Sequence, residues 1–193
     1  MTTTQIISLL LTATLLFWGL GAYNRMVRLR GEIGLRYGLV HEQLQSRHVL
    51  LLRWLQAMEP WLGNDPGASE ALRVSCDQLQ QAADHARQRP SAARRIASLR
   101  TAEDDLTAAR GRVLAAMPTQ VQSVAPIAAL ADVDGPVTPS IPALFEELTA
   151  AGGLLTLARQ QFNEAVQDYN EAIDQFPTWI IAGLFRFRSA GVI

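Results

Sequence analysis

The stretch FNEAVQDYNEAIDQFP, residues 162–177, repeats itself every seven residues. An aromatic side chain returns at Phe162, Tyr169 and Phe176, and the triplet Asn-Glu-Ala occurs twice at the same spacing. On an α-helix a step of seven returns to nearly the same face, so the aromatics line one side with alanines between them. Alternating large and small side chains let a second helix approach closely. The stretch therefore predicts a long helix that packs against another helix.

The acidic residues of this stretch fall beside the aromatic stripe, at Glu164, Asp168 and Glu171. A carboxylate-bridged metal site in a bundle uses Glu-x-x-His on two helices, and no Glu of the chain has a His three residues later. A general acid needs a desolvated carboxyl group, and nothing in the pattern buries these three. The chain also lacks the G-x-S-x-G, H-E-x-x-H and G-x-G-x-x-G motifs. We therefore expect no catalytic residue, no cofactor and no small-molecule substrate in a protein that is not an enzyme.

Composition argues against several other classes of site. All 17 basic residues are Arg, so the chain has no lysine for a P-loop or a Schiff base. The net charge of −1 argues against nucleic acid as a partner. Cys76 is the single cysteine, which excludes an internal disulfide, and its place on an apolar stripe predicts a buried thiol. His41 and His48 have no second pair of ligands, so they are predicted to be bundle histidines rather than metal ligands.

Residues 1–24 carry no charged side chain. Within them IISLLLTATLLFWGLGA, residues 6–22, and its flanks reach the roughly 20 residues that a bilayer core requires, which predicts a transmembrane anchor at about 5–23. A cleaved signal peptide would carry its positive charge before the apolar run, not after it. The positive-inside rule places the short N-terminus outside and the rest in the cytoplasm. The predicted membrane-interface residues are two aromatics and a collar of arginines: Trp18, Tyr23, Arg25, Arg28 and Arg30.

Residues 25–193 are predicted to form one helical bundle domain. The first helix continues from the anchor without a break and ends near the turn GNDPGAS at 63–69. Steps of three and four residues define its apolar seam, in which a histidine is the one polar member: Ile33, Tyr37, Val40, Leu44, His48, Leu51, Leu55, Met58 and Leu62. A second helical region, about 70–117, is predicted to be kinked or briefly broken near Pro90, with Ser91 as a new cap. Its apolar stripe is Leu72, Cys76, Leu79, Ala83, Ala86, Ile96, Leu99, Leu106, Ala109, Val113 and Ala116.

A proline-rich loop at 118–142 separates this region from a third helix of about 143–176. The heptad stripe of the third helix is Leu148, Leu155, Phe162, Tyr169 and Phe176. Pro177 ends the helix, and an apolar tail follows at 177–193. No strand-like alternation of useful length occurs. The predicted fold is all-α: an N-terminal transmembrane helix followed by an antiparallel up-and-down bundle of three long helices.

Several residues of the last helix and the tail are candidates for partner contacts. Asn163 and Asn170 occupy equivalent heptad positions, where they either hydrogen-bond to a neighbouring helix and fix its register or stay exposed. The tail either folds back into a groove of its own bundle or contacts a partner or the membrane. The acidic run EDD at 103–105 is predicted to be a solvated surface or a weak docking patch. The candidate partner or register contacts are Asn163, Asp168, Tyr169, Asn170, Trp179, Phe185 and Arg186.

Both ends of the chain resemble the LemA family. LARQQFNEAVQDYNEAIDQFPTWIIAGLFRFR, residues 157–188, is similar to that family's A-R-x-x-Y/F-N-x-A-V-x-D-Y-N helix followed by FP and I-A-G-L-F. YNRMVRLR at 23–30 and VHEQLQSRHVLL at 40–51 resemble the family's N-terminal motifs. The chain departs from the family pattern at His41, Val49 and Leu52, where Asp, Asp and Pro are usual.

The resemblance implies a single-pass membrane protein with a helical bundle domain, and a family without an established catalytic activity. We therefore expect a protein of the bacterial cytoplasmic membrane that acts as a scaffold or adaptor for membrane-associated proteins. A self-associating protein that organises or remodels the membrane is the alternative. An enzyme with an unrecognised site is the third hypothesis, and a deep polar pocket with buried titratable groups would favour it.

Overall fold

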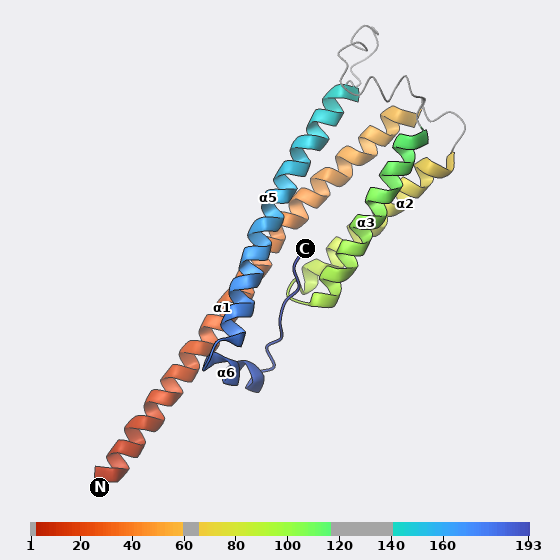
Figure 1. The fold of residues 1–193 in the computed structure, drawn as a ribbon. Coiled ribbons are helices and arrows are strands. Elements are labelled where there is room, and N and C mark those ends of the chain that lie inside the picture. The colour runs from red at the N-terminus through yellow and green to blue at the C-terminus, as the bar shows by residue number, and fades with distance from the viewer. Residues whose placement is uncertain (1–2, 60–65, 117–140) are drawn as a thin grey trace.

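The fold is a helical rod with one long bare end (Figure 1). The computed structural model describes residues 3–59, 66–116 and 141–193. The helices are α1 (Thr3–Met58), α2 (Pro66–Gln88), α3 (Ala93–Ala116), α5 (Ile141–Asp174) and α6 (Thr178–Leu184). No strand occurs within these ranges, which confirms the all-α prediction. The four long helices run alternately up and down (Figure 1).

Helix α1 is continuous from the apolar N-terminal segment into the bundle, as predicted. Its first part projects from the bundle as a bare helix (Figure 1). The first buried side chain is that of Met26, just beyond the predicted anchor. In the described part of the chain, α1 is the one helix long and apolar enough to cross a membrane. The same helix therefore supplies the apolar projection and one wall of the core.

The second helical region differs from the prediction, because it forms two helices. Helices α2 and α3 lie side by side as an antiparallel hairpin (Figure 1), so the described residues form four long helices where three were predicted. The chain reverses at residues 89–92, where the N–H of Ala92 donates to the carbonyl of Arg89 at 3.0 Å. The carbonyl of Ala92 accepts the first bonds of α3, from Arg95 and Ile96, so Ala92 rather than Ser91 is the N-terminal boundary residue.

The buried core follows the predicted stripes with few exceptions. Tyr37, an aromatic residue of the first seam, contacts two other helices. Its hydroxyl donates to the carbonyl of Ala83 at 2.9 Å, and its ring lies 5.7 Å from that of Phe162. Tyr37 thus joins α1 to both α2 and α5. Burial raises the pKa of this phenol far above its ordinary value, with the carboxylates of Asp84 and Glu103 adding to the effect.

Some predictions about the seams and the proline-rich loop need correction or lie outside the described residues. His41 is buried and His48 only half-buried, whereas the seam had been assigned to His48. Phe176 is 76% exposed, because α5 ends at Asp174 and the stripe ends with it. Leu62 and the loop at 118–140 lie outside the described residues.

Candidate functional site

A partly buried ionic cluster joins three helices near the middle of the bundle. Glu103 of α3 forms an ion pair with Arg159 of α5, and the electrostatic field of Arg47 on α1 acts on the same carboxylate. Burial raises the pKa of Glu103, and the two guanidinium groups oppose that shift. The acidic run at 103–105 is therefore not a uniformly solvated surface, because its first residue faces the core. The ion pair therefore links α3 to α5 through side chains that are largely removed from solvent.

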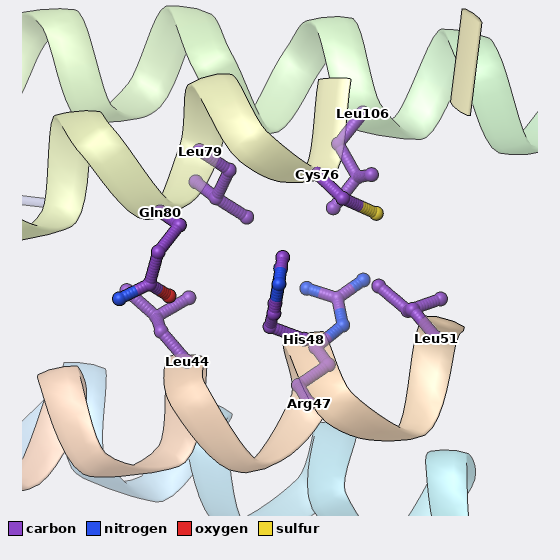
Figure 2. Close-up of a pocket in the computed structure, with 8 residues that line it drawn as sticks. All are labelled: Leu44, Arg47, His48, Leu51, Cys76, Leu79, Gln80 and Leu106. Atoms are coloured by element: carbon purple, nitrogen blue, oxygen red, sulfur yellow. The ribbon is translucent and has the colours of Figure 1, made fainter. Parts of the chain in front are cut away.

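A small cavity lies beside this cluster, between α1, α2 and α3 (Figure 2). Its volume is about 10 Å³, which is close to the minimum for one water molecule. Figure 2 shows the side chains of Arg47 and His48 pointing toward Cys76. Burial raises the pKa of the Cys76 thiol to about 11, so the group stays protonated and unreactive at neutral pH. The lining residues are Leu44, Arg47, His48, Leu51, Cys76, Leu79, Gln80 and Leu106.

The two histidines weighed as metal ligands both face α2 but have different surroundings. His41 is buried with its Nε2 atom 3.4 Å from Oδ1 of Asp84, and its ring lies 6.5 Å from that of Tyr37. Burial lowers the pKa of His41, the guanidinium of Arg87 lowers it further, and Asp84 opposes both. His48 lines the small cavity. Across residues 3–59, 66–116 and 141–193, no group of three His, Cys, Asp or Glu side chains is placed to hold a metal ion.

The C-terminal segment, residues 185–193, folds back along the bundle between the α1–α5 pair and the α2–α3 hairpin (Figure 1). Two asparagines of α5 hold it. The Nδ2 of Asn163 donates to the carbonyl of Ile193 at 2.9 Å, and its Oδ1 accepts the N–H of the same residue at 2.9 Å. The Nδ2 of Asn170 donates to the carbonyl of Ala190 at 3.1 Å, and its Oδ1 accepts that residue's N–H at 2.8 Å. We call this pair of contacts the asparagine clamp.

A tyrosine reinforces the clamp, because the hydroxyl of Tyr169 donates to the carbonyl of Arg188 at 3.1 Å. Burial raises the pKa of Tyr169, and the nearby guanidinium of Arg30 opposes that shift. Three of the four α5 residues proposed as partner or register contacts therefore bind the chain's own tail. The fourth, Asp168, is exposed.

A match to a known protein family covers this same C-terminal region. Residues 138–192 match the LemA family. This confirms the LemA resemblance over α5, α6 and most of the tail, while the motifs at 23–30 and 40–51 lie outside the matched range. No curated protein and no solved structure matches the chain. The LemA-matched segment thus contains both asparagines of the clamp and most of the tail that they hold.

The LemA-matched segment also contains the short helix α6, which lies against α1 where the bare helix enters the bundle (Figure 1). The rings of Tyr23 and Phe185 are 4.8 Å apart, and those of Tyr23 and Phe187 are 5.9 Å apart. Trp179, Phe185 and Arg186, proposed from the sequence as contacts, are all exposed. The remaining predicted membrane-interface residues, Trp18, Arg25, Arg28 and Arg30, are exposed as well.

Helix α6 ends in a turn that aims the tail back up the bundle. Arg186 adopts a left-handed backbone conformation with φ of 55°. The N–H of Phe187 donates to the carbonyl of Ala182 at 2.9 Å, and the N–H of Arg186 donates to that of Gly183 at 3.3 Å. This pair of bonds is a Schellman motif, in which glycine usually holds the position that Arg186 has here. Sequence reasoning missed this turn because no glycine marked it.

Proposed function

We propose that this protein is a single-pass, membrane-anchored helical bundle that acts as a scaffold or adaptor for membrane-associated proteins, and that it is not an enzyme. The observation that carries the proposal is the single helix α1 (Thr3–Met58), which combines an exposed apolar segment with a seam buried in the bundle. A rigid helix of this kind would hold a protein-binding rod upright on a bilayer.

Two features support the anchor. The apolar segment of α1 is exposed along its length, and a bare apolar helix of about 20 residues suits a bilayer core. The exposed arginines Arg25, Arg28 and Arg30 follow it directly, which favours an outside N-terminus and a cytoplasmic bundle by the positive-inside rule. Together with the LemA match, these features support a place in a bacterial cytoplasmic membrane.

The ion pair of Glu103 with Arg159 and the asparagine clamp support a structural rather than a catalytic role. The charges of Glu103 and Arg159 are paired with each other, and both clamp asparagines bind backbone groups of the tail. The cavity beside Cys76 has room for about one water molecule, far less than the hundreds of Å³ typical of a substrate pocket.

The bundle also exposes large apolar side chains outside the apolar N-terminal segment. Leu35 and Leu39 lie on α1, and Leu154 and Leu157 lie on α5. Within each pair the two leucines are three or four residues apart, so they share one face of their helix. These leucines are therefore the places at which we expect a partner protein, or a second copy of this chain, to bind.

Site-specific photo-cross-linking in cells tests the proposal. A photoreactive amino acid replaces Leu157 in the tagged full-length chain, and the matched control replaces the exposed Arg112 on α3. We expect a discrete protein cross-linked at position 157 and absent at position 112, identified by mass spectrometry after purification from the membrane. Cross-links between copies of this chain alone would favour the membrane-organising alternative. Equal, diffuse cross-linking at both positions would contradict the scaffold proposal.

A further inference from the structure

We propose that α6 is a second membrane contact, a short helix that lies in the headgroup region of the bilayer beside the anchor. The inference rests on the proposed transmembrane role of α1. It assigns a lipid-binding surface to α6 and the turn after it, residues 178–188.

The position of α6 along α1 indicates how deep α6 lies in the proposed bilayer. A Cβ atom added at Gly19 would lie 3.6 Å from Cδ1 of Ile181, and the Tyr23 ring packs on Phe185. Residues 19–23 form the last turn of the predicted span, immediately before Arg25. If the apolar part of α1 crosses the bilayer core, α6 therefore lies at the boundary between the acyl chains and the headgroups. Aromatic residues concentrate at this level in membrane proteins.

Helix α6 exposes large apolar side chains on its outer face. Thr178 and Ala182 face the bundle and are 8% and 5% exposed, and Ile181 is half-buried against the core. The outward residues Trp179 and Leu184 are large and apolar, yet 54% and 72% exposed. A helix with large apolar side chains on its outer face gains free energy when that face is covered.

The charges around α6 point to an anionic surface. Three exposed arginines follow the apolar part of α1 and two follow α6, and neither residues 1–31 nor residues 177–193 contain an acidic residue. No ion pair engages these arginines within the part of the chain that the structure describes. Basic residues close to a membrane surface are attracted to anionic lipids. The five arginines are Arg25, Arg28, Arg30, Arg186 and Arg188.

Lipid fits this surface better than a protein partner because the surface is continuous with the anchor. The exposed face of α6 adjoins the bare apolar part of α1, and both meet at Gly19 and Tyr23. A bilayer that surrounds the anchor would necessarily reach α6 at the same depth. Aromatic and aliphatic side chains flanked by arginine are typical of helices that lie in the membrane interface.

Site-directed spin labelling of the full-length chain tests this inference separately from the anchor. Single cysteines replace Phe17, Leu184 or Arg112 in a Cys76→Ala background, and each variant carries a nitroxide in vesicles of phosphatidylcholine and phosphatidylglycerol. All three positions are exposed, so the substitutions should leave the fold intact, which circular dichroism checks. Collision with oxygen reports lipid, and collision with a water-soluble nickel complex reports water. Position 17 tests the anchor, position 184 tests α6, and position 112 is the solvent control.

We expect the ratio of oxygen to nickel accessibility at positions 17 and 184 to exceed that at 112 severalfold. In vesicles of phosphatidylcholine alone, nickel accessibility should rise at 184 and stay unchanged at 17. A lipid signal at 17 together with a water signal at 184 overturns the inference and leaves the anchor standing. Shielding of 184 from both reagents indicates a protein contact and also overturns it. A water signal at 17 overturns the proposed anchor, and the inference with it.

Discussion

Among single residues, Asn163 and Asn170 hold the tail through both polar atoms of their side-chain amides. An asparagine amide has the same donor and acceptor as a peptide group, so Asn163 and Asn170 each bind one tail residue as a β-strand neighbour would. The spacings agree: seven helical residues rise about 10.5 Å, and three extended residues span about 10 Å. The clamp hydrogen bonds therefore involve only backbone N–H and C=O groups of the tail, so they do not depend on the identity of the side chains at 190 and 193.

Loss of one clamp asparagine should release the tail locally. Asn170→Ala removes two hydrogen bonds to Ala190, which at about 1 kcal/mol each predicts a loss of about 1–2 kcal/mol in the free energy of unfolding. Trypsin should also cleave faster after Arg188 in the folded protein. Asp168→Ala, an exposed change on the same helix, is the control and should shift stability by less than about 0.5 kcal/mol. Unchanged trypsin cleavage in Asn170→Ala would contradict a clamp role.

The buried His41 should make stability depend on pH. Burial lowers its pKa below the ordinary value of 6.5, so between those two pKa values the unfolded chain binds more protons than the folded chain. The free energy of unfolding should therefore rise with pH across that window and fall as the solution is acidified below about pH 6.5. His41→Leu should flatten this part of the profile in denaturant titrations of the detergent-solubilised chain. His85→Ala removes an exposed histidine and is the control; a profile unchanged by His41→Leu would refute the assignment.

At the scale of helices, the heptad patterns predicted the buried faces and missed how the chain turns. The seam around Tyr37 and the stripe around Phe162 are buried as predicted, because side-chain spacing alone decides which face of a helix is apolar. Pro90 indicates that the helix is interrupted, but the local sequence around it is the same for a kinked helix and for a chain that reverses direction. Their difference comes from packing between α2 and α3, which no local pattern contains.

The candidate contact residues show the same contrast: spacing predicts which residues matter, but it does not predict what they contact. Asn163 and Asn170 were singled out by spacing, yet their partner is an extended tail rather than a helix. The sequence predicts a solvated run or a weak docking patch at 103–105, whereas Glu103 pairs with Arg159, a residue 56 positions away on another helix. Contacts of this kind depend on helix register, which composition and periodicity leave open.

Tail docking against the hairpin should depend on a small side chain at Gly191. A Cβ atom added there would lie 3.1 Å from the Cα of Ala93, so Gly191→Ala requires the tail or the start of α3 to give by a few tenths of an ångström. Overpacking of this kind costs about 1–3 kcal/mol. Gly153→Ala is the matched control: nothing lies within 4 Å of the added atom, and the helix should gain about 1 kcal/mol. Thermal unfolding of both variants checks the prediction, and equal effects would contradict close packing at Gly191.

At the scale of the whole molecule, two connections couple the bundle to the proposed membrane. Helix α1 runs through without a break, and α6 rests on it at the level of Gly19 and Tyr23. The tail then carries the connection from α6 to the clamp on α5 and to the start of α3. A bundle held at two points on one face of its base has a defined tilt, which a scaffold needs if it is to present its partners at a fixed height.

The rigidity of this connection is measurable between two exposed positions of α1. Nitroxides on Phe17→Cys and Leu35→Cys, in a Cys76→Ala background, lie 18 residues apart on the same side of the helix. An unbroken helix predicts one narrow distance distribution near about 27 Å, since each residue rises about 1.5 Å. Gly31→Pro removes a backbone hydrogen bond between the labels and should broaden the distribution.

Gly31→Ala is the control for that substitution, because an added Cβ atom meets nothing within 4 Å there and should leave the distance unchanged. A broad distribution in the chain without a substitution at Gly31 would mean that anchor and bundle move independently. The tilt of the bundle would then depend on α6 alone, and the role of α1 would reduce to tethering. A narrow distribution supports a bundle whose orientation is set by the helix that anchors it.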